Sequence, residues 1–438
     1  MKIKSLSVGG FKNLDYTQLS LENIVAIVSP NNYGKSNLLE ALSFATDFIT
    51  ASTKTRKNMM KWPKGIPLTK ALEDKEFVFE IEFYEPSLGE YAYVRYGYSF
   101  VWYKDDNTGA RITNEWIDLH SEETKRYSSY LKREEGKYRK GNSTTALRKI
   151  TFDDAQLAID VLSSVPDLEY ANAIQAIQKF EYRNCSSLEL QNRFQASPIE
   201  MIGTQNDSIK FDDEDVPRAL YCLKEKYPEK YQLFKEAIFI LFPEFIDFDV
   251  QSYEPKKEAL HMFVTNGEQT ESIDDSKVPF QIRDELYRLI IKTNTLNQPI
   301  NISMMSTGTK RIFWLLSNVF VSSCTEVSCI GIEELETSIH PKMLKNLLEI
   351  LDDALGETRL IVSSHSPYLI QYLKTTQVFV GVPSISGVAQ FKKILPNKTK
   401  QLLSISSDYG MSYGEYLFEL LSGDESSYEI VQKYLEDN

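Results

Sequence analysis

The stretch from residue 24 to residue 42, IVAIVSPNNYGKSNLLEAL, decides the fold of this chain. It opens on an apolar and mostly β-branched run that is typical of a buried strand. A turn containing Gly34, Lys35 and Ser36 follows, and then an apolar pattern typical of a helix. A strand, a glycine-containing loop and a helix in this order present backbone N–H groups and a helix N-terminus to phosphate oxygens. The stretch therefore predicts a nucleotide-binding P-loop fold.

Within this loop, each polar residue has a predicted task. Lys35 neutralises the charge of the terminal phosphate, and the Ser36 hydroxyl holds Mg²⁺. Gly34 lets the backbone approach the phosphates closely. The usual pattern has a further glycine five residues before Gly34, where this chain has Ser29. An ordinary strand-to-helix turn that contains Gly-Lys-Ser by coincidence is the alternative interpretation.

Three later segments carry polar residues where a predicted strand ends or a predicted helix begins. A small-residue segment with Ser306 and Gly308 precedes an apolar helical pattern. One strand pattern ends on Glu333 and Glu334, and another ends on a polar turn with His365. Each segment alone has an ordinary structural explanation. The first would be a helix N-cap, the second a solvated strand end, and the third a turn whose histidine hydrogen-bonds the backbone. Together with the phosphate loop they predict one site, because ligands bind at the carboxyl ends of parallel strands.

The two consecutive carboxylates receive different roles because side chains alternate along a strand. Glu333 is predicted to approach the metal, and Glu334 to act as the general base on the attacking water. His365 is predicted to hydrogen-bond the γ-phosphate.

These motifs resemble those of the ABC-type ATPase heads of the SMC, RecF and OLD proteins. The resemblance covers roughly residues 1–105 and 278–395. The segments that carry it are Gly10-Phe11-Lys12-Asn13-Leu14 (the first-strand element), Asn31 and Gly34 to Leu42 (Walker A), Met305 to Thr309 (the signature motif), Glu333 to Glu336 with His340-Pro341 (Walker B and D-loop) and His365 (the switch histidine).

The resemblance implies an α/β P-loop NTPase, an ABC ATPase head, with a mostly parallel core sheet, an antiparallel β lobe and a largely helical insertion. It implies ATP and Mg²⁺ as cofactors, with Glu334 and His365 catalytic and Ser36 and Glu333 at the metal. The residues implied to contact the nucleotide are Lys12, Asn31, Asn32, Gly34, Lys35, Ser36, Asn37, Ser306 and Gly308. Ser306 and Gly308 are implied to act from a second copy, in a homodimer or higher homo-oligomer.

The chain departs from the group's pattern at three positions. Ser29 replaces a glycine, Glu333 stands where aspartate is usual, and Leu335 stands where proline is usual. These departures leave open a slow ATPase and, beyond it, a nucleotide-binding scaffold with little turnover.

At 438 residues the chain is too long for one ordinary core, so two lobes or a core with a large insertion are expected. We expect head lobe I over residues 1–105, a mainly helical insertion or arm over 106–277, head lobe II over 278–395 and a C-terminal tail over 396–438. The aromatic tail could dock a separate effector, and a terminal helix packed on its own head is the alternative.

Charge and composition limit the classes of partner that the chain is expected to bind. The formal charge of 49 minus 62, or −13, argues against a general nucleic-acid coat but allows local basic patches. Two basic stretches, 54–70 and 125–149, are candidate surfaces for DNA or RNA, with solvated loops as the alternative. Four cysteines without a C-x-x-C pair indicate reduced thiols. No apolar run reaches the roughly 20 residues that span a bilayer, and no signal peptide is evident, so a cytoplasmic protein without a membrane partner is expected.

By resemblance, heads of this size without their own nuclease occur in bacterial anti-phage systems such as PARIS and Septu. The expected function is therefore an ATPase sensor or regulator that controls a separate nuclease or toxin effector. A RecF-like DNA-binding ATPase of repair or recombination is the alternative.

Overall fold

The structure is a computed structural model of the chain. It describes residues 1–61, 65–67, 69–104, 108–124, 126–134, 137–140, 148–149, 152–165, 167–185, 192–195, 199–201, 215–255, 263–266, 269–272, 280–325 and 327–436. The chain divides into two compact units, which are described separately. The first comprises Met1–Ser186, Thr325–Glu336 and Asp352–Asn438, and the second comprises Ser187–Cys324 and Thr337–Leu351.

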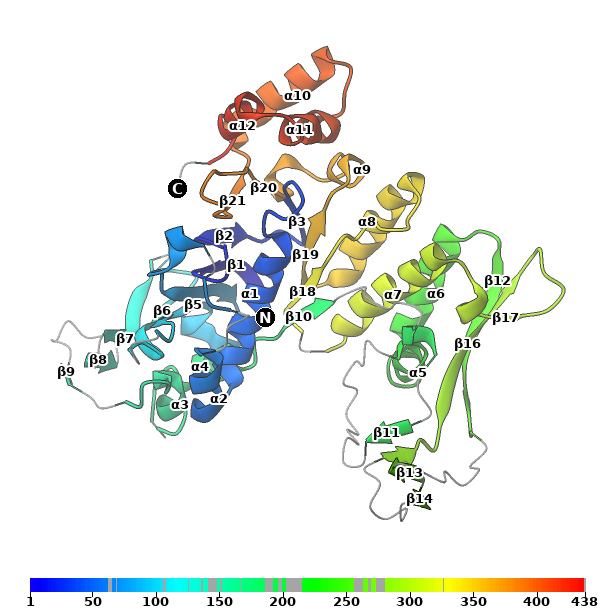
Figure 1. The fold of residues 1–438 in the computed structure, drawn as a ribbon, viewed down its shortest axis with the longest axis horizontal. Coiled ribbons are helices and arrows are strands. Elements are labelled where there is room, and N and C mark those ends of the chain that lie inside the picture. The colour runs from blue at the N-terminus through cyan, green and yellow to red at the C-terminus, as the bar shows by residue number, and fades with distance from the viewer. Residues whose placement is uncertain are drawn as a thin grey trace. The chain divides into compact units, whose positions relative to one another are not determined.

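A six-stranded sheet forms the core of the first unit (Figure 1). In order across the sheet its strands are β10 (Tyr182–Cys185), β18 (Cys329–Ile332), β19 (Arg359–Ser364), β3 (Ile24–Val28), β20 (Val378–Gly381) and β21 (Phe391–Lys393). The first five run parallel, and β21 pairs antiparallel to β20. Every residue of β3, β18 and β19 is buried, as expected for a sheet covered on both faces. The register places Val28 beside Ser364, so β3 and β19 end at the same edge.

An eight-stranded sheet forms the β lobe of the same unit. Its order is β2 (Thr17–Ser20), β1 (Lys2–Gly9), β4 (Phe77–Tyr84), β5 (Tyr93–Val101), β6 (Arg111–His120), β7 (Ser128–Glu134), β8 (Lys137–Lys140) and β9 (Arg148–Lys149). Its neighbouring strands pair antiparallel throughout this order.

Aromatic rings fill the space between this sheet and helix α1 (Lys35–Thr50). Phe48 of α1 stacks on Tyr98 and Phe100 of β5, with ring centroids 5.0 Å and 4.9 Å apart. Helix α2 (Thr53–Met59) follows α1. Trp102 lies just beyond β5, and its indole N–H donates to the carbonyl oxygen of Gly10 at 2.8 Å. The helix that begins at the phosphate loop is therefore anchored in the aromatic core of the β lobe.

The described residues of the predicted insertion over 106–277 form strands as well as helices, so this part of the chain is not largely helical. Strands β6 to β9 lie within it and extend the antiparallel sheet, because β6 pairs along its length with β5. Strand β10 joins the core sheet. The described residues of the region also form the α-helices α3 (Ala158–Leu162), α4 (Ala171–Gln178), α5 (Val216–Lys226) and α6 (Pro228–Leu241).

In the second unit, helices α5, α6 and α7 (Thr307–Ser322) pack with a sheet of β12 (Phe245–Tyr253), β16 (Leu286–Thr293) and β17 (Ile300–Asn301). Its remaining strands are β11 (Ile199–Met201), β13 (Phe263–Asn266), β14 (Gln269–Ser272) and β15 (Phe280–Ile282). Phe234, Phe248 and Phe313 meet edge to face at its centre. Helix α8 (Pro341–Leu355) begins in this unit.

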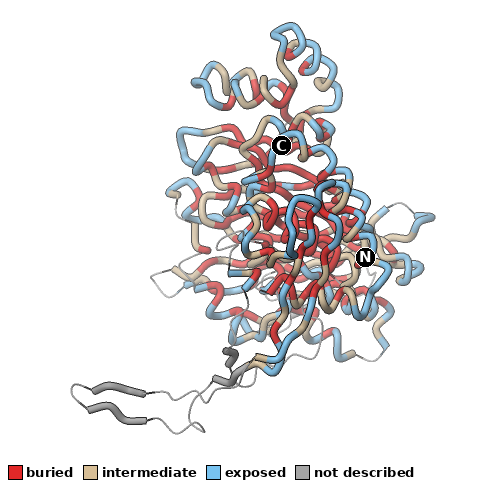
Figure 2. Tube along the Cα trace, turned by 90° about the vertical axis from the view of Figure 1, so that its right-hand side faces the viewer, coloured by how far each residue is buried: buried red, intermediate tan, exposed pale blue. Residues whose placement is uncertain are grey.

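The C-terminal residues fold onto the first unit as helices α10 (Thr399–Asp408), α11 (Tyr413–Leu421) and α12 (Glu425–Gln432). Figure 2 shows exposed and buried turns alternating along these helices at the top of the view. Helix α11 packs closely on α9 (Pro367–Ile370), where the Tyr413 hydroxyl donates to the carbonyl oxygen of Ile370. A Cβ added to Gly414 would lie 2.5 Å from the carbonyl oxygen of Pro367. The tail therefore packs on its own head, which was the alternative interpretation of this segment.

Among the described residues, no helix combines the length and apolar character that crossing a bilayer requires.

Candidate nucleotide site

The phosphate loop occupies the turn between β3 and α1, as the sequence predicts. Gly34 caps α1 with φ of +124°, a conformation that favours glycine. A Cβ on Gly34 would lie 2.9 Å from both Asn13 Oδ1 and Ala389 Cβ. Asn32 has φ of +60°, which asparagine tolerates better than most residues. The loop therefore has a defined shape that its sequence can adopt.

Lys35 is buried beneath the loop, with 6% of its surface exposed. Its Nζ donates to the carbonyl oxygens of Ser29 at 2.9 Å and Pro30 at 3.0 Å. Burial lowers the pKa of Lys35 from 10.5 to about 8, against the opposing attraction of the Glu334, Glu336 and Glu333 carboxylates. The two carbonyls are neutral acceptors, and a phosphate oxygen makes a stronger, charge-assisted hydrogen bond. An arriving phosphate can therefore draw the ammonium away from the loop.

The first-strand turn supports the loop from the side. Asn37 of α1 donates to Asn13 Oδ1 at 2.7 Å, and Asn13 donates in turn to the carbonyl oxygen of Tyr33 at 3.0 Å. Lys12 pairs with Glu40. In this structure Asn37 and Lys12, both predicted to contact nucleotide, bind protein groups. The supporting role of Asn13 is not apparent from the sequence, because it joins residues that are distant along the chain.

The two predicted acids follow β18 directly. Glu333 is half-buried and Glu334 is exposed. Glu334 has φ of +46°, which is unusual for a residue with a side chain, and its N–H donates to Ser363 Oγ at 3.2 Å. Such a conformation costs on the order of 1–3 kcal/mol and is found mainly at functional sites. The turn that carries the predicted base is therefore strained and held in place from β19.

His365 lies beside the lysine. Its Nδ1 is 3.5 Å from Lys35 Nζ. Burial, followed by the Lys35 charge, lowers the pKa of His365, while Glu334 opposes the shift. The lowered pKa favours the neutral imidazole, in which one ring nitrogen can donate a hydrogen bond and the other can accept one.

Glu336 is a residue that the site prediction missed. Its Oε1 accepts hydrogen bonds from Ser364 Oγ at 2.9 Å and from the His365 N–H at 2.8 Å. Its Oε2 is buried without a hydrogen-bond partner among the described residues, and burial raises the pKa of Glu336. A third carboxylate within four residues of Glu333 is the signal in the sequence that points to it.

The predicted signature segment belongs to the second unit. Ser306 caps α7, and its Oγ accepts from the Thr309 N–H at 3.1 Å. Ser306 and Thr307 are exposed. A Cβ on Gly308 would lie 2.5 Å from the carbonyl oxygen of Ser338, so any side chain there would displace the backbone. The segment is thus a capped helix start with exposed polar groups.

A family model described as an AAA ATPase domain matches residues 1–370. The chain belongs to this family. The match confirms that the motifs resemble those of an ATPase, and it agrees with a phosphate loop at the carboxyl edge of a parallel sheet. The family is one of nucleotide-binding ATPase domains.

Solved structures that resemble this AAA ATPase domain include SMC heads. They include an SMC head bound to the C-terminal winged-helix domain of ScpA (13% identity, 92% of this chain and 100% of that chain covered, TM-score 0.49). An SMC head domain from Thermotoga maritima has 11% identity, 90% and 100% coverage and a TM-score of 0.42. A Pyrococcus furiosus-derived SMC head with an extended coiled coil, bound to the C-terminal domain of ScpA, has 12% identity, 93% and 99% coverage and a TM-score of 0.49. A search of curated proteins found no match.

The oxygen groups at the loop of this AAA ATPase domain fit Mg²⁺ by their chemistry. Mg²⁺ prefers hard oxygen ligands and is usually held by one or two carboxylates together with substrate phosphates. The exposed Ser36 hydroxyl and the Glu333 carboxylate are oxygen ligands of this kind. Among the described residues, no cluster of three or more His, Cys, Asp or Glu side chains could hold a metal alone. These two oxygen groups would suit a metal that is also coordinated by nucleotide phosphates.

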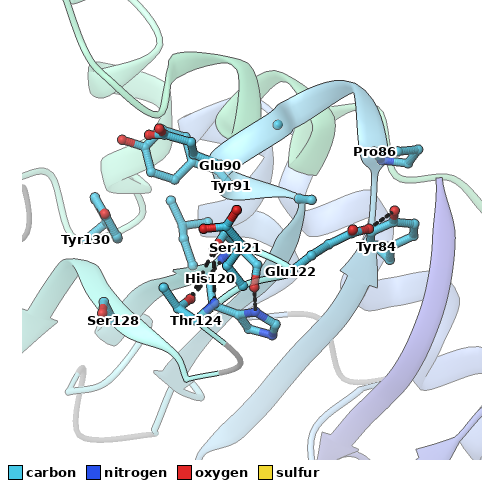
Figure 3. A pocket seen from close by; sticks show the side chains of 14 residues that line it. Tyr84, Pro86, Glu90, Tyr91, His120, Ser121, Glu122, Thr124, Ser128 and Tyr130 are labelled. Atoms are coloured by element: carbon cyan, nitrogen blue, oxygen red, sulfur yellow. Dashed lines mark hydrogen bonds between the residues drawn. The ribbon is translucent and has the colours of Figure 1, made fainter.

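A cavity of about 780 Å³ lies elsewhere on the first unit, at the antiparallel sheet (Figure 3). Its lining includes Tyr84, Tyr91, His120, Glu122 and Tyr130, and none of the predicted site residues. Figure 3 shows two of its hydrogen bonds, from Tyr84 to Glu122 and between His120 and the carbonyl oxygen of Ser121. The cavity is separate from the predicted nucleotide chemistry.

Two cations of the basic stretches serve the core of this AAA ATPase domain. Arg56 is 1% exposed, pairs with Asp160 and donates to the carbonyl oxygen of Phe48 at 2.7 Å. Arg133 is buried beside Glu115, with 3.7 Å between their charged atoms. Part of each stretch, including Lys64 and Lys125, lies outside the described residues. Counting the cations of these two stretches in the sequence therefore overestimates the number that lie on the surface.

Proposed function

We propose that this chain binds and hydrolyses ATP and works as a switch that closes on nucleotide. The observation that carries the proposal is the distance of 3.5 Å between Lys35 Nζ and His365 Nδ1, at the edge of the sheet where β3 and β19 end. Charges of Glu334 and Glu333 act on the same lysine. A buried cation, a neutral histidine and carboxylates at a phosphate loop form a set suited to phosphoryl transfer to water.

The proposed mechanism assigns one task to each residue. Backbone N–H groups of the loop and the N-terminus of α1 bind phosphate, and Lys35 leaves its carbonyl partners to neutralise the terminal phosphate. Glu334 takes a proton from the water that attacks the γ-phosphorus, and the bond to the ADP oxygen breaks. Neutral His365 hydrogen-bonds a γ-phosphate oxygen. Ser36 and Glu333 would hold Mg²⁺, which would neutralise charge on the phosphates.

We further propose a homodimer in which Ser306 and Gly308 of one copy complete the site of the other. The exposed hydroxyls of Ser306 and Thr307 at the start of α7, and a Gly308 that tolerates no side chain, support this assignment. A helix N-terminus with exposed donors suits a γ-phosphate that approaches from outside the chain.

For the biological role, we propose the ATPase sensor or regulator of an anti-phage system, which controls a separate nuclease or toxin. The support is the motif resemblance to heads of the PARIS and Septu kind, which is an argument by analogy. The alternative is a RecF-like DNA-binding ATPase. It draws on the basic stretch 125–149, in which Arg126 and Lys137 are exposed.

Phosphate release from ATP tests the proposal directly. Wild-type protein should release phosphate in the presence of Mg²⁺, while Lys35→Ala should lose ATP binding and Glu334→Gln should bind ATP without hydrolysing it. Glu349→Ala is a suitable control because Glu349 is exposed on α8 and makes only a long ion pair of 3.9 Å with Lys345 among the described residues. Equal hydrolysis by wild type and Glu334→Gln would reject the role of the base.

The two biological roles predict different binding. DNA affinity that falls steeply with salt and requires residues 125–149 would favour the RecF-like alternative. Co-purification of a nuclease or toxin with the ATPase, and loss of phage protection in Lys35→Ala, would favour the regulator.

A further inference from the structure

We infer that Glu336 is the positioning residue of the His365 turn, and that ATP hydrolysis depends on it through His365. This inference rests on the proposed function. Glu336 lies four residues beyond the end of β18, and His365 is the first residue after β19. A single carboxylate oxygen, Oε1, joins these two strand ends.

The hydrogen bonds at this carboxylate fix the turn on both sides of His365. Oε1 of Glu336 accepts from the His365 N–H at 2.8 Å and from Ser364 Oγ at 2.9 Å. Ser364 Oγ itself accepts from the Ser366 N–H at 3.0 Å. Three successive residues, Ser364 to Ser366, are therefore tied directly or through one hydroxyl to the same oxygen. The backbone of His365 has little freedom while Glu336 is present.

A second link joins the same two strand ends. The N–H of Glu334 donates to Ser363 Oγ at 3.2 Å. Hydrogen bonds thus join the strained turn at Glu334 to the turn at His365, so displacement of one turn disturbs the other. Glu336 makes its link with a single carboxyl oxygen that accepts two hydrogen bonds.

The unpartnered oxygen indicates that Glu336 is not kept for stability alone. A buried acceptor without a hydrogen bond costs about 1–3 kcal/mol, and more when charged. Oε2 of Glu336 is such an atom among the described residues. A smaller polar side chain could satisfy the turn at lower cost. A costly group at a site of this kind is expected where placement of a neighbour matters for function.

Three single variants separate the hydrogen-bonding oxygen from the charge. Glu336→Ala removes the acceptor, Glu336→Gln keeps an amide oxygen that can accept both bonds, and Ser364→Ala removes one of the two donors. We expect Glu336→Ala to lower kcat for phosphate release by roughly 10- to 100-fold, while ATP affinity changes less than about threefold. Ser364→Ala should lose less than Glu336→Ala, and Glu336→Gln should retain most of the wild-type kcat.

A double-mutant cycle with His365→Ala tests whether Glu336 acts through that residue. If it does, Glu336→Ala adds little further loss in the His365→Ala background. If the kcat losses of Glu336→Ala and His365→Ala multiply in the double variant, the inference is overturned. It is also overturned if Glu336→Gln is as slow as Glu336→Ala. Thermal unfolding of each variant, with Glu349→Ala as control, identifies losses of activity that come from misfolding. If Glu336→Ala misfolds, the kcat values of Ser364→Ala and Glu336→Gln test the inference instead.

The outcomes also separate this inference from the proposed function. If Lys35→Ala abolishes ATP binding and wild type hydrolyses ATP, but Glu336→Ala matches wild type, only the role of Glu336 fails. If wild type binds ATP without hydrolysing it, the proposed function fails and the inference fails with it.

Discussion

The charge of Lys35 depends on both its burial and the carboxylates near it. Burial costs the ammonium its hydration, and three nearby carboxylates restore only part of that free energy, so the pKa of Lys35 falls to about 8. The side chain is held meanwhile by carbonyl oxygens of its own loop. Its charge therefore depends on pH within an experimentally accessible range.

ATP affinity should fall as pH rises through about 8, because Lys35 loses its proton there and with it the charge that attracts phosphate. Titration of the nucleotide dissociation constant between pH 6.5 and 9.5 measures the effect. Lys35→Ala should bind weakly and with a flatter pH profile. An affinity that is constant over this range in wild type would contradict the assignment.

Gly34 should tolerate alanine poorly. Its φ of +124° disfavours any side chain, and a Cβ would meet Asn13 Oδ1 and Ala389 Cβ at 2.9 Å. We expect Gly34→Ala to lower the free energy of unfolding by about 2–4 kcal/mol, measured by denaturant titration. Gly356→Ala is the matched control, since Gly356 has φ of +58° and open space around it. Equal losses at both positions would show that the loop does not hold Gly34 tightly.

At the scale of elements, α11 and α9 connect the C-terminal helices to the His365 turn. Helix α9 begins two residues after His365, at Pro367. Tyr413 and Gly414 of α11 contact the backbone of α9 directly. The tail is thus packed against the helix that directly follows the His365 turn.

Gly414→Ala should therefore affect both stability and turnover. The added methyl group would lie 2.5 Å from the carbonyl oxygen of Pro367 and 3.1 Å from the N atom of Gln371, which forces α11 away from α9. We expect a loss of about 1–3 kcal/mol in unfolding free energy and a lower rate of phosphate release, with ATP affinity unchanged. Gly410→Ala is the contrasting variant, because Gly410 has φ of +70° and no neighbour within 4 Å, so alanine there adds backbone strain without crowding. Wild-type turnover in Gly414→Ala would argue against the connection.

At the scale of the whole molecule, the proposed site needs two copies of the chain. Ser306→Asp should keep the cap of α7, because aspartate is also a good N-cap, while its charge repels phosphate. A one-to-one mixture of Ser306→Asp and Lys35→Ala, each inactive alone, should recover about a quarter of wild-type hydrolysis, since half of the randomly formed dimers contain one intact site of two. Ser306→Asn is the neutral control. A mixture as inactive as its components would contradict a shared site.

Local patterns in the sequence predict the phosphate loop, the parallel strands and the order of the motifs. The strand Arg111–His120 is not evident in the same way, because its alternation breaks. Ile112 and Thr113 are both buried, at an irregularity where the pairing with β5 shifts between Ser99 and Phe100. The support of the loop by Asn13, and the link from Glu336 to His365, join segments that no local pattern relates. These contacts require the structure.

The indole of Trp102 gives the protein a built-in optical reporter. Its N–H is bonded to the carbonyl oxygen of Gly10, in the turn that leads to Lys12 and Asn13, and the ring is 4% exposed among phenylalanines. Fluorescence of a buried indole responds to changes in its hydrogen bond and in the polarity of its surroundings. Movement of that turn when ATP arrives would therefore change the emission of an unlabelled sample, and replacing the other three tryptophans, Trp62, Trp116 and Trp314, by phenylalanine would assign the signal to Trp102.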